Sequence, residues 1–520
     1  MELLIVVVAG LLAVAGAAAI APRLRIAAPL ILVVMGIGIS VLPFVPDIEI
    51  DPEWILAGVL PPLLYSAAVA MPAMNFRREF TAIRGLAVAL VVLSAVVLGV
   101  FFSWAIPGLS IWWGIALGAI VSPTDAVATS IVRSVGVSGR VSSVLAGESL
   151  LNDATALVLL RSAIAGTAAT MTLRHIALDF AWAVAVALVL GLVVGRLNLW
   201  VRAKVADSTV NTIISFTVPF LASIPAELLG ASGLVAAVVA GLVTGHGAPR
   251  VLPPRHRQSD TQNWHTVELV LEGAIFLVMG LELSAIVGDV NDQHVGLGTA
   301  FVVALAALAL VLVVRAAYVA PLLAGLARGA RRRTQRTTVT SDPRHRRSLA
   351  DIDYLLAAPL GWRDGAVLVW AGMRGAVTLA AAQTLPSDAP ERSLLVLIAF
   401  VVAASSLLIQ GGTLGAFVRW IRPTEPTPDP GRTEELTAIL VRVRDDLIAS
   451  TDPDERVPVE PPEIVAGHVT LPPTLSLRVL DAQRDALLDA RDDGLFDAEL
   501  LEAALERLDA AQISVELRGP

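Results

Sequence analysis

The feature that most limits the fold of this chain is a series of about 13 segments that are long and apolar enough to cross a lipid bilayer. A spanning helix needs roughly 20 mostly apolar residues, and inside a bilayer only helices and closed barrels satisfy every backbone hydrogen bond. Charged residues make up 16% of the chain, against about 25% in soluble proteins. The sequence therefore predicts an all-α polytopic membrane protein whose spans lie at approximately 3–21, 26–43, 54–72, 84–106, 112–132, 141–167, 176–200, 209–228, 231–247, 265–287, 297–326, 362–386 and 392–421.

Basic residues are concentrated in every second loop between these spans. They include Arg77, Arg78, Arg84, Arg133, Arg140, Arg250, Arg255 and Arg257. Loops rich in Lys and Arg stay on the cytoplasmic side. The pattern predicts a multi-pass protein of a bacterial-type plasma membrane, with the N-terminus outside and the C-terminus in the cytoplasm.

The chain divides at about residue 422 into two parts of opposite charge. Residues 1–422 carry 24 acidic and 29 basic residues, whereas residues 423–520 carry 22 acidic and 9 basic residues. The second part follows a proline-rich linker and spaces its leucines at three and four, as in amphipathic helices. We expect a transmembrane domain over 1–422 and an acidic, helical cytosolic tail over 423–520. A nucleic-acid partner is not expected, because phosphate binding requires positive charge.

The chain has no cysteine, which excludes thiol catalysis and cysteine-ligated metal centres. We expect no cofactor.

The fifth span is interrupted by the sequence Ser-Pro-Thr-Asp at 122–125. Pro123 removes an amide donor and clashes with the preceding helical turn. In a membrane such a break is tolerated where the freed backbone lines a cavity or is satisfied by neighbours, and transporters use broken helices to hold ions near the midplane. Thr124 and Asp125 lie at this break. The alternative is a proline kink in which Asp125 caps the second half-helix.

The sixth span places several polar side chains in one sector of an otherwise apolar helix. Ser149 and Asp153 are four residues apart and share a stripe, and the adjoining stripe holds Glu148, Asn152 and Thr155. A polar seam that joins helices would explain Ser, Asn and Thr. Two carboxyl groups in the same seam favour a functional site.

Two arginines are expected to be buried opposite this seam, Arg374 in the twelfth span and Arg315 in the eleventh. Gly372 and Gly375 flank Arg374, which suggests a second broken helix. If Arg374 neutralises Glu148, that carboxylate is structural. Asp153 then has no evident partner and can hold either a proton or a small cation.

Five motifs carry a resemblance to a known family. They are Ser-Pro-Thr-Asp-Ala-Val-Ala from 122, Gly-Glu-Ser-Leu-Leu-Asn-Asp-Ala-Thr-Ala-Leu-Val from 147, Phe-Leu-Val-Met-Gly-Leu-Glu-Leu from 276, Gly-Met-Arg-Gly-Ala-Val-Thr-Leu-Ala-Ala-Ala from 372 and Leu-Ile-Gln-Gly-Gly-Thr-Leu from 408. Together they resemble the monovalent cation/proton antiporter-1 family, the sodium/proton exchangers. The resemblance covers about residues 1–421.

The resemblance implies an inverted repeat, in which spans one to six are mirrored by spans eight to thirteen and two discontinuous helices cross. It implies a homodimer with a dimerisation domain (spans 1–3 and 8–10) and a core domain (spans 4–6 and 11–13). The transported ions would be Na⁺, or Li⁺ or K⁺, and H⁺. The family's pairing of Asn with Asp, here Asn152 and Asp153, goes with electroneutral exchange.

The same resemblance implies roles for individual residues. Asp153 would be the shared cation and proton carrier, with Ser149 and Thr124 as Na⁺ ligands and Asn152 beside them. Glu148 and Arg374 would form a structural ion pair, Asp125 would compensate charge at the helix ends, and Arg315 would be a second buried cation.

One position departs from the family pattern. Relatives carry an acidic residue in the third span, where this chain has Ser66. Ser66 is therefore a candidate cation ligand, and a K⁺-selective or promiscuous cation/proton exchanger stays open as an alternative.

A remote alternative from another class rests on Gly-Ala-Ser-Gly at 230–233, the nucleophile pattern of intramembrane serine proteases with Ser232 as nucleophile. Such an enzyme needs a nearby histidine, and His246 and His265 are expected at the ends of their spans. Small residues at a helix interface explain the motif better. In the tenth span, Glu272 is expected to be a polar lining residue.

Overall fold

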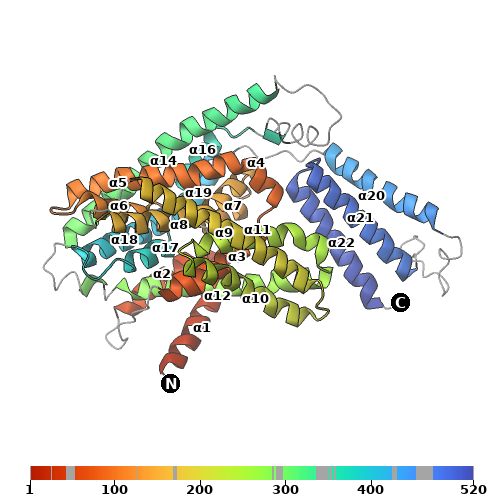
Figure 1. Ribbon diagram of the computed structural model, residues 1–520, viewed down its shortest axis with the longest axis horizontal. Helices are drawn as coiled ribbons and strands as arrows, with labels where there is room; N and C mark the ends of the chain where they lie inside the picture. The colour runs from red at the N-terminus through yellow and green to blue at the C-terminus, as the bar shows by residue number, and fades with distance from the viewer. Residues whose placement is uncertain are drawn as a thin grey trace.

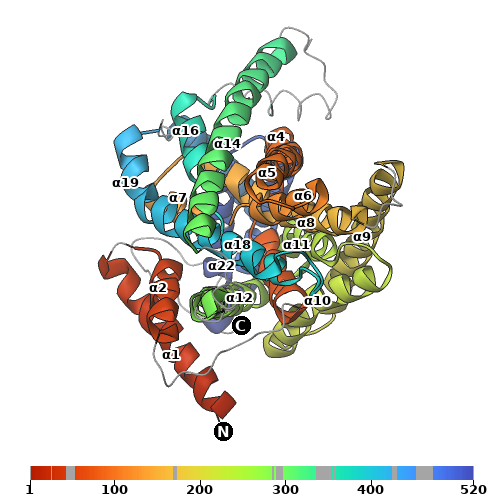
Figure 2. The ribbon, with the colours of Figure 1, turned by 90° about the vertical axis from the view of Figure 1, so that its left-hand side faces the viewer.

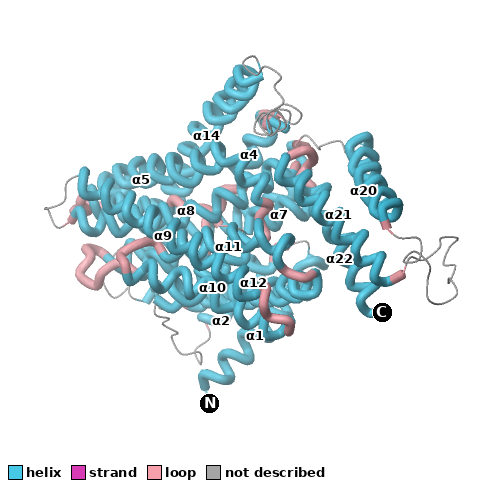
Figure 3. The backbone as a smooth tube through the Cα atoms, turned by 45° about the vertical axis from the view of Figure 1, so that its right-hand side comes forward, coloured by secondary structure: helices cyan, strands magenta, loops and turns pink. Residues whose placement is uncertain are grey.

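The computed structural model describes residues 2–24, 26–41, 53–125, 127–167, 173–283, 286–288, 297–334, 351, 354–355, 359–423, 430–451 and 472–518. Every regular element in these ranges is a helix (Figure 3). Nine of the described helices are long and apolar enough to cross a membrane, and three shorter apolar helical segments accompany them. The all-helical membrane fold is thus confirmed. All of the expected spans coincide with helix, and the count of 13 crossings stays a prediction.

The helices pack in two groups, which Figure 2 shows end-on. We name the first group the scaffold. It consists of α1 (Glu2–Leu24), α2 (Ala28–Ser40), η1 (Trp54–Val59), α3 (Leu60–Val69), α9 (Leu173–Arg202), α10 (Ser208–Leu228), α11 (Gly233–Val251) and α12 (Pro254–Leu281). Within it α11 packs on α3, α9 and α10, and α12 packs on α2.

The second group, the core, consists of α4 (Ala73–Arg84), η2 (Gly85–Leu90), α5 (Val91–Ala105), α6 (Ile111–Val121), α7 (Val127–Val135), α8 (Gly139–Gly166), α14 (Leu297–Thr334), α16 (Trp362–Trp370), α17 (Ala376–Gln383), α18 (Arg392–Ser406), η3 (Leu407–Gly411) and α19 (Gly412–Ile421). Here α6 packs on α5 and α8, and α14 packs on α5, α16 and α18. The assignment of the two groups to dimerisation and transport stays a prediction.

Small residues allow the closest approach between helices in the scaffold. Gly36 of α2 faces Gly280 of α12, and a Cβ atom on Gly280 would lie 2.4 Å from the carbonyl oxygen of Val33. Lipid chains are as apolar as the helix surfaces, so helices in a membrane associate through such close packing rather than through a hydrophobic driving force.

The tail contains α20 (Pro430–Ser450), α21 (Pro473–Asp493) and α22 (Ala498–Arg518). The three helices lie together beyond one end of the membrane helices (Figure 1). Their leucines belong to a small apolar cluster separate from the main one, which includes Leu436, Leu487, Leu488, Leu501, Leu505 and Leu508. The amphipathic helices predicted for this part of the chain are confirmed. Its cytosolic location stays a prediction.

Candidate functional site

Two interrupted helices meet at the centre of the core. In one, α6 ends at Val121 and α7 begins at Val127; in the other, α16 ends at Trp370 and α17 begins at Ala376. The N–H of Asp125 in the first break donates a hydrogen bond to the carbonyl of Met373 in the second, at 2.8 Å. The predicted discontinuous crossed helices are confirmed.

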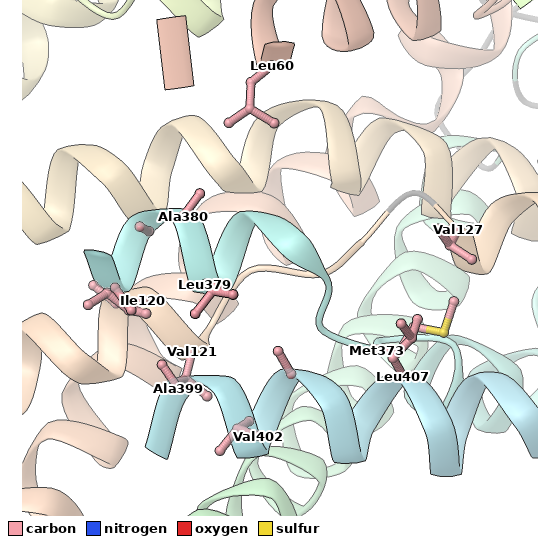
Figure 4. Packing of buried hydrophobic residues seen from close by; sticks show 14 of the residues in the cluster. Leu60, Ile120, Val121, Val127, Met373, Leu379, Ala380, Ala399, Val402 and Leu407 are labelled. Atoms are coloured by element: carbon pink, nitrogen blue, oxygen red, sulfur yellow. The ribbon is translucent and has the colours of Figure 1, made fainter. Parts of the chain in front are cut away.

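Apolar side chains hold the two breaks in place (Figure 4). Leu379 of α17 lies on the side that faces Val121 and α18, and Met373 lies beside Leu407. Each of these four residues is 3% exposed or less. The polar backbone of the breaks is thereby enclosed on this side by a dry layer.

Arg374 lies on the carbonyl ends of the interrupted helices. Its guanidinium donates to the carbonyls of Val121 at 3.1 Å and Ser122 at 3.5 Å, and to that of Gly372. The last carbonyls of a helix have no partner within the helix and carry partial negative charge. Arg374, 1% exposed, supplies both the donors and the positive charge that these ends need.

Asp125 lies at the opposite kind of helix end. Its Oδ1 accepts a hydrogen bond from the N–H of Val127, the first residue of α7, at 3.1 Å. A carboxylate at a helix N-terminus is favourable for the same electrostatic reason. A Cβ atom on Gly375, which precedes α17, would lie only 1.3 Å from Oδ2 of Asp125, so the chain requires glycine there.

The ion pair in the core differs from the predicted one. Glu148 of α8 pairs with Arg315 of α14 through two hydrogen bonds, one of which is 2.7 Å, and Nε of Arg315 donates to the carbonyl of Leu368 at 2.8 Å. The predicted pairing of Glu148 with Arg374 was wrong, because the free carbonyls at the break engage the Arg374 guanidinium. Both members of the observed pair are 2% exposed or less.

Thr124 and Asn152 extend this network toward Asp153. The Thr124 hydroxyl donates to Oε1 of Glu148 at 3.1 Å. The Asn152 amide donates to the hydroxyl of Thr124 at 2.7 Å and to its carbonyl at 3.0 Å. Asn152, which is fully buried, therefore fixes the first break onto α8.

A cavity of about 280 Å³ lies between the core and the scaffold. Four of the predicted site residues line it, namely Thr124, Asp125, Ser149 and Asp153. Asp153 is 6% exposed. No hydrogen bond or ion pair to its carboxyl is found within the described ranges.

The scaffold contributes α3 and α12 to the same cavity. Glu272 of α12 lines it, as predicted, and so does Glu268 one turn earlier. Ser66, the candidate ligand on α3, is 5% exposed but does not belong to the cavity lining, whereas Leu63 and Ala67 do. Its proposed place among the cation ligands stays a prediction.

Four further polar lining residues were missed as site residues from the sequence: Thr129, Ser130, Arg133 and Thr378. Thr378 follows the second break by one helical turn, and Arg133 lies in the last turn of α7. The positions of Thr129, Ser130 and Thr378 in the first turn after each break were a signal that could have identified them.

The protease alternative finds no support at Ser232. Its hydroxyl caps α11 by accepting the N–H of Val235 at 3.3 Å. The cavity beside it is lined by Arg161, Asp179 and Glu227, and no histidine is among the described residues of that lining.

Comparison with known proteins identifies the family. The model of the family described as "Sodium/hydrogen exchanger, transmembrane" matches residues 9–420, which are the greater part of the chain. The chain belongs to this family.

Relatives of this exchanger match over similar lengths. A protein of Mycobacterium tuberculosis described as an uncharacterized Na⁺/H⁺ exchanger is 28% identical over 98% of this chain and 96% of its own length. The Na⁺/H⁺ antiporter NhaG of Bacillus atrophaeus is 28% identical over 82% of this chain and 76% of its own length. The predicted family is thus confirmed, and its members are transporters rather than enzymes.

A solved structure shows the same fold. The sodium proton antiporter MjNhaP1 of Methanocaldococcus jannaschii superposes with a TM-score of 0.59 at 17% identity, covering 81% of this chain and 99% of that one. At this identity the likeness concerns the fold alone.

Proposed function

We propose that this chain exchanges Na⁺ for H⁺ across a bacterial plasma membrane, with Asp153 as the carrier that binds either ion. The names of its relatives support Na⁺ as the cation. A K⁺-selective or promiscuous exchanger is the second candidate, because Ser66 stands where the family pattern has an acidic residue.

The observation that carries the proposal is the contrast between two buried carboxylates five residues apart on α8. The Glu148 carboxylate accepts hydrogen bonds from Arg315 and from the Thr124 hydroxyl. Asp153 faces an open cavity, and no hydrogen bond or ion pair to its carboxyl is found in the described part of the chain. A buried carboxylate is costly unless its charge is neutralised. A proton or a small cation can neutralise Asp153.

Oxygen ligands for Na⁺ lie in the same cavity. Ser149 is one turn before Asp153 on α8, and Thr124 belongs to the break that crosses it. Hydroxyl, carbonyl and carboxylate oxygens are the ligands that hard cations prefer. Na⁺ would be held by Asp153, Ser149 and Thr124, with Asn152 keeping Thr124 in position through its two hydrogen bonds.

One exchangeable carboxylate predicts electroneutral exchange. The site carries the same net charge with Na⁺ as with H⁺ bound, so one ion replaces the other without net charge movement. Glu148, Arg315, Arg374 and Asp125 are engaged at fixed positions and serve as structural charges.

Alternating access is supported by the position of the cavity. Asp153 and both breaks belong to the core, whereas α3 and α12 on the opposite wall belong to the scaffold. Rocking of the core against the scaffold would open this cavity to each side in turn. A homodimer formed through the scaffold would hold that wall still during the motion.

Glu268 and Glu272 add negative charge to the scaffold wall. A cavity lined by one sign of charge raises the local concentration of the opposite ion. We assign Glu272 an attracting role, distinct from the carrier role of Asp153, because it lies on the wall opposite the broken helices.

The test is transport by the full chain in liposomes with an imposed pH gradient, followed with a pH-sensitive dye. Addition of Na⁺ should dissipate the gradient in wild type and leave it unchanged in Asp153→Asn. Asp207→Asn is the matched control, because Asp207 is an exposed cap of α10 and Asn caps helices equally well. Normal exchange by Asp153→Asn would refute the carrier role; a response to K⁺ but not to Na⁺ would favour the second candidate.

A further inference from the structure

The tail helices α21 and α22 contact the scaffold through a row of ion pairs. Arg257 of α12 pairs with Asp509, and Arg255 pairs with Glu516 at 2.8 Å. Arg250 of α11 pairs with both Asp489 at 3.0 Å and Asp492 at 2.8 Å. The acidic charge of the tail thus meets the basic ends of α11 and α12.

The same two helices contact the core. Arg78 of α4, which is 8% exposed, donates a hydrogen bond to the carbonyl of Gly494 between α21 and α22 at 2.7 Å. Met74, also on α4, belongs to the apolar cluster of the tail. Glu499 lies against the start of α8, where a Cβ atom on Gly139 would be 1.9 Å from Oε1 of Glu499. The tail therefore bridges the two groups, as Figures 1 and 3 show.

The bridge lies next to the ion cavity. Ala70 and Met71 line that cavity and also a smaller one, of about 90 Å³, whose other wall includes Glu502 of α22. Arg133, in the lining of the ion cavity, is near enough to Glu502 to lower its pKa. The docked tail thus lies beside the cavity that Asp153 lines.

We propose that α21 and α22 form a latch that, when docked, holds the scaffold and the core in one relative position and slows exchange. This inference rests on the proposed alternating-access function. Rocking of the core would have to break either the Arg78 contact or the ion pairs of Arg250, Arg255 and Arg257, since the same two tail helices hold both sides.

The charges around Glu502 make docking of the latch depend on pH. Partial removal from water, and then the carboxylates of Glu506 and Glu499, raise the pKa of Glu502 from 4.5 to about 7, against the opposing effect of Arg133 and Arg491. His246 of α11 also lines the small cavity.

The sign follows from linkage, because the state that binds protons more tightly is favoured by acid. If the pKa of Glu502 returns to about 4.5 on release, docking is firmest at acid pH. It weakens as the pH rises through about 7. Exchange should accordingly be slow at acid pH and faster at alkaline pH.

Docking can be measured without transport. The chain has no cysteine, so Arg255→Cys with Glu516→Cys in full-length protein reports docking through cross-linking by a short bismaleimide. Cross-linking should fall as the pH rises from 6 to 8. Arg250→Glu, which sets like charges against Asp492, should lower it at pH 6, and adding Asp492→Arg should restore it. Lys204→Glu is the matched control, because Lys204 is exposed and contacts Trp200 rather than the tail.

Transport is then measured in liposomes without the cysteines. Arg250→Glu should raise exchange at pH 6 about fivefold, with Lys204→Glu unchanged. Glu502→Gln, which cannot ionise, should lower exchange at pH 8. Released docking with unchanged exchange would overturn the latch, and so would cross-linking that does not depend on pH or on Arg250. If wild type exchanges no cation while docking behaves as expected, the proposed function fails rather than the docking.

Discussion

The pairing of Glu148 with Arg315 makes a quantitative prediction about stability. Arg315→Met replaces the guanidinium side chain with an apolar one of roughly similar length. It removes both hydrogen bonds to Glu148 and the one to the Leu368 carbonyl. Glu148, 1% exposed, is then a buried charge without its cation. Breaking a buried pair by removing one partner costs about 3–5 kcal/mol. At roughly 2–4 °C per kcal/mol for a large domain, the unfolding midpoint should fall by about 6–20 °C.

A double-mutant cycle separates this pair from the pair predicted by sequence. Glu148→Gln combined with Arg315→Met should be more stable than the sum of the single changes by about 2–3 kcal/mol, since neither residue is then a lone charge. The same cycle with Arg374→Met should give a coupling below about 1 kcal/mol, because Arg374 bonds to carbonyls rather than to Glu148.

Intrinsic fluorescence in detergent is a suitable assay, because the chain has ten tryptophans and no cysteine for thiol dyes. Equal coupling of Glu148 to both arginines, or stronger coupling to Arg374, would refute the assignment.

Two other perturbations test the cavity. Glu272→Gln should raise the Na⁺ concentration for half-maximal exchange about two- to fivefold with little change in the maximal rate, because it removes an attracting charge rather than the carrier; Asp388→Asn, exposed and outside the cavity lining, should change neither. Gly375→Ala should abolish exchange and cost about 1–3 kcal/mol of stability through its clash with Asp125, measured by transport and by thermal unfolding. Gly412→Ala is its control, since a Cβ there meets nothing within 4 Å, and equal behaviour of the two variants would contradict the close approach.

The sequence was sufficient to locate the broken helices and the proposed carrier, because both depend on residues that are rare inside a span. Pro123 and the glycines around Arg374 mark backbone that cannot continue as helix, and each break is observed at that place. Asp153 and Ser149 share a stripe by helical spacing alone, and both line the cavity. Local backbone chemistry and helical periodicity carry this information without knowledge of the packing.

The partners across helices could not be predicted in the same way. Arg315 and Arg374 are both buried cations, and choosing between them as partner of Glu148 depends on how α14 and α16 are rotated against α8. A charge count also ignores backbone carbonyls, which are acceptors for Arg374. Ser66 lies outside the cavity lining for a related reason: Leu63 and Ala67 face the cavity, and the rotation of α3 is set by its packing on α11.

The arrangement of fixed charges suggests why exchange would be coupled. Glu148 is balanced by Arg315, Arg374 by helix carbonyls and Asp125 by a helix amide, so Asp153 is the group whose charge depends on its cargo. With Na⁺ or H⁺ bound, the site is close to neutral and can pass the apolar layer between the two groups. Without cargo, the carboxylate would have to cross that layer as an uncompensated charge, which is costly in a low-dielectric interior. In the proposed mechanism the empty carrier would therefore be held on one side until an ion binds, and each Na⁺ released would have to be replaced by a proton before the core could return.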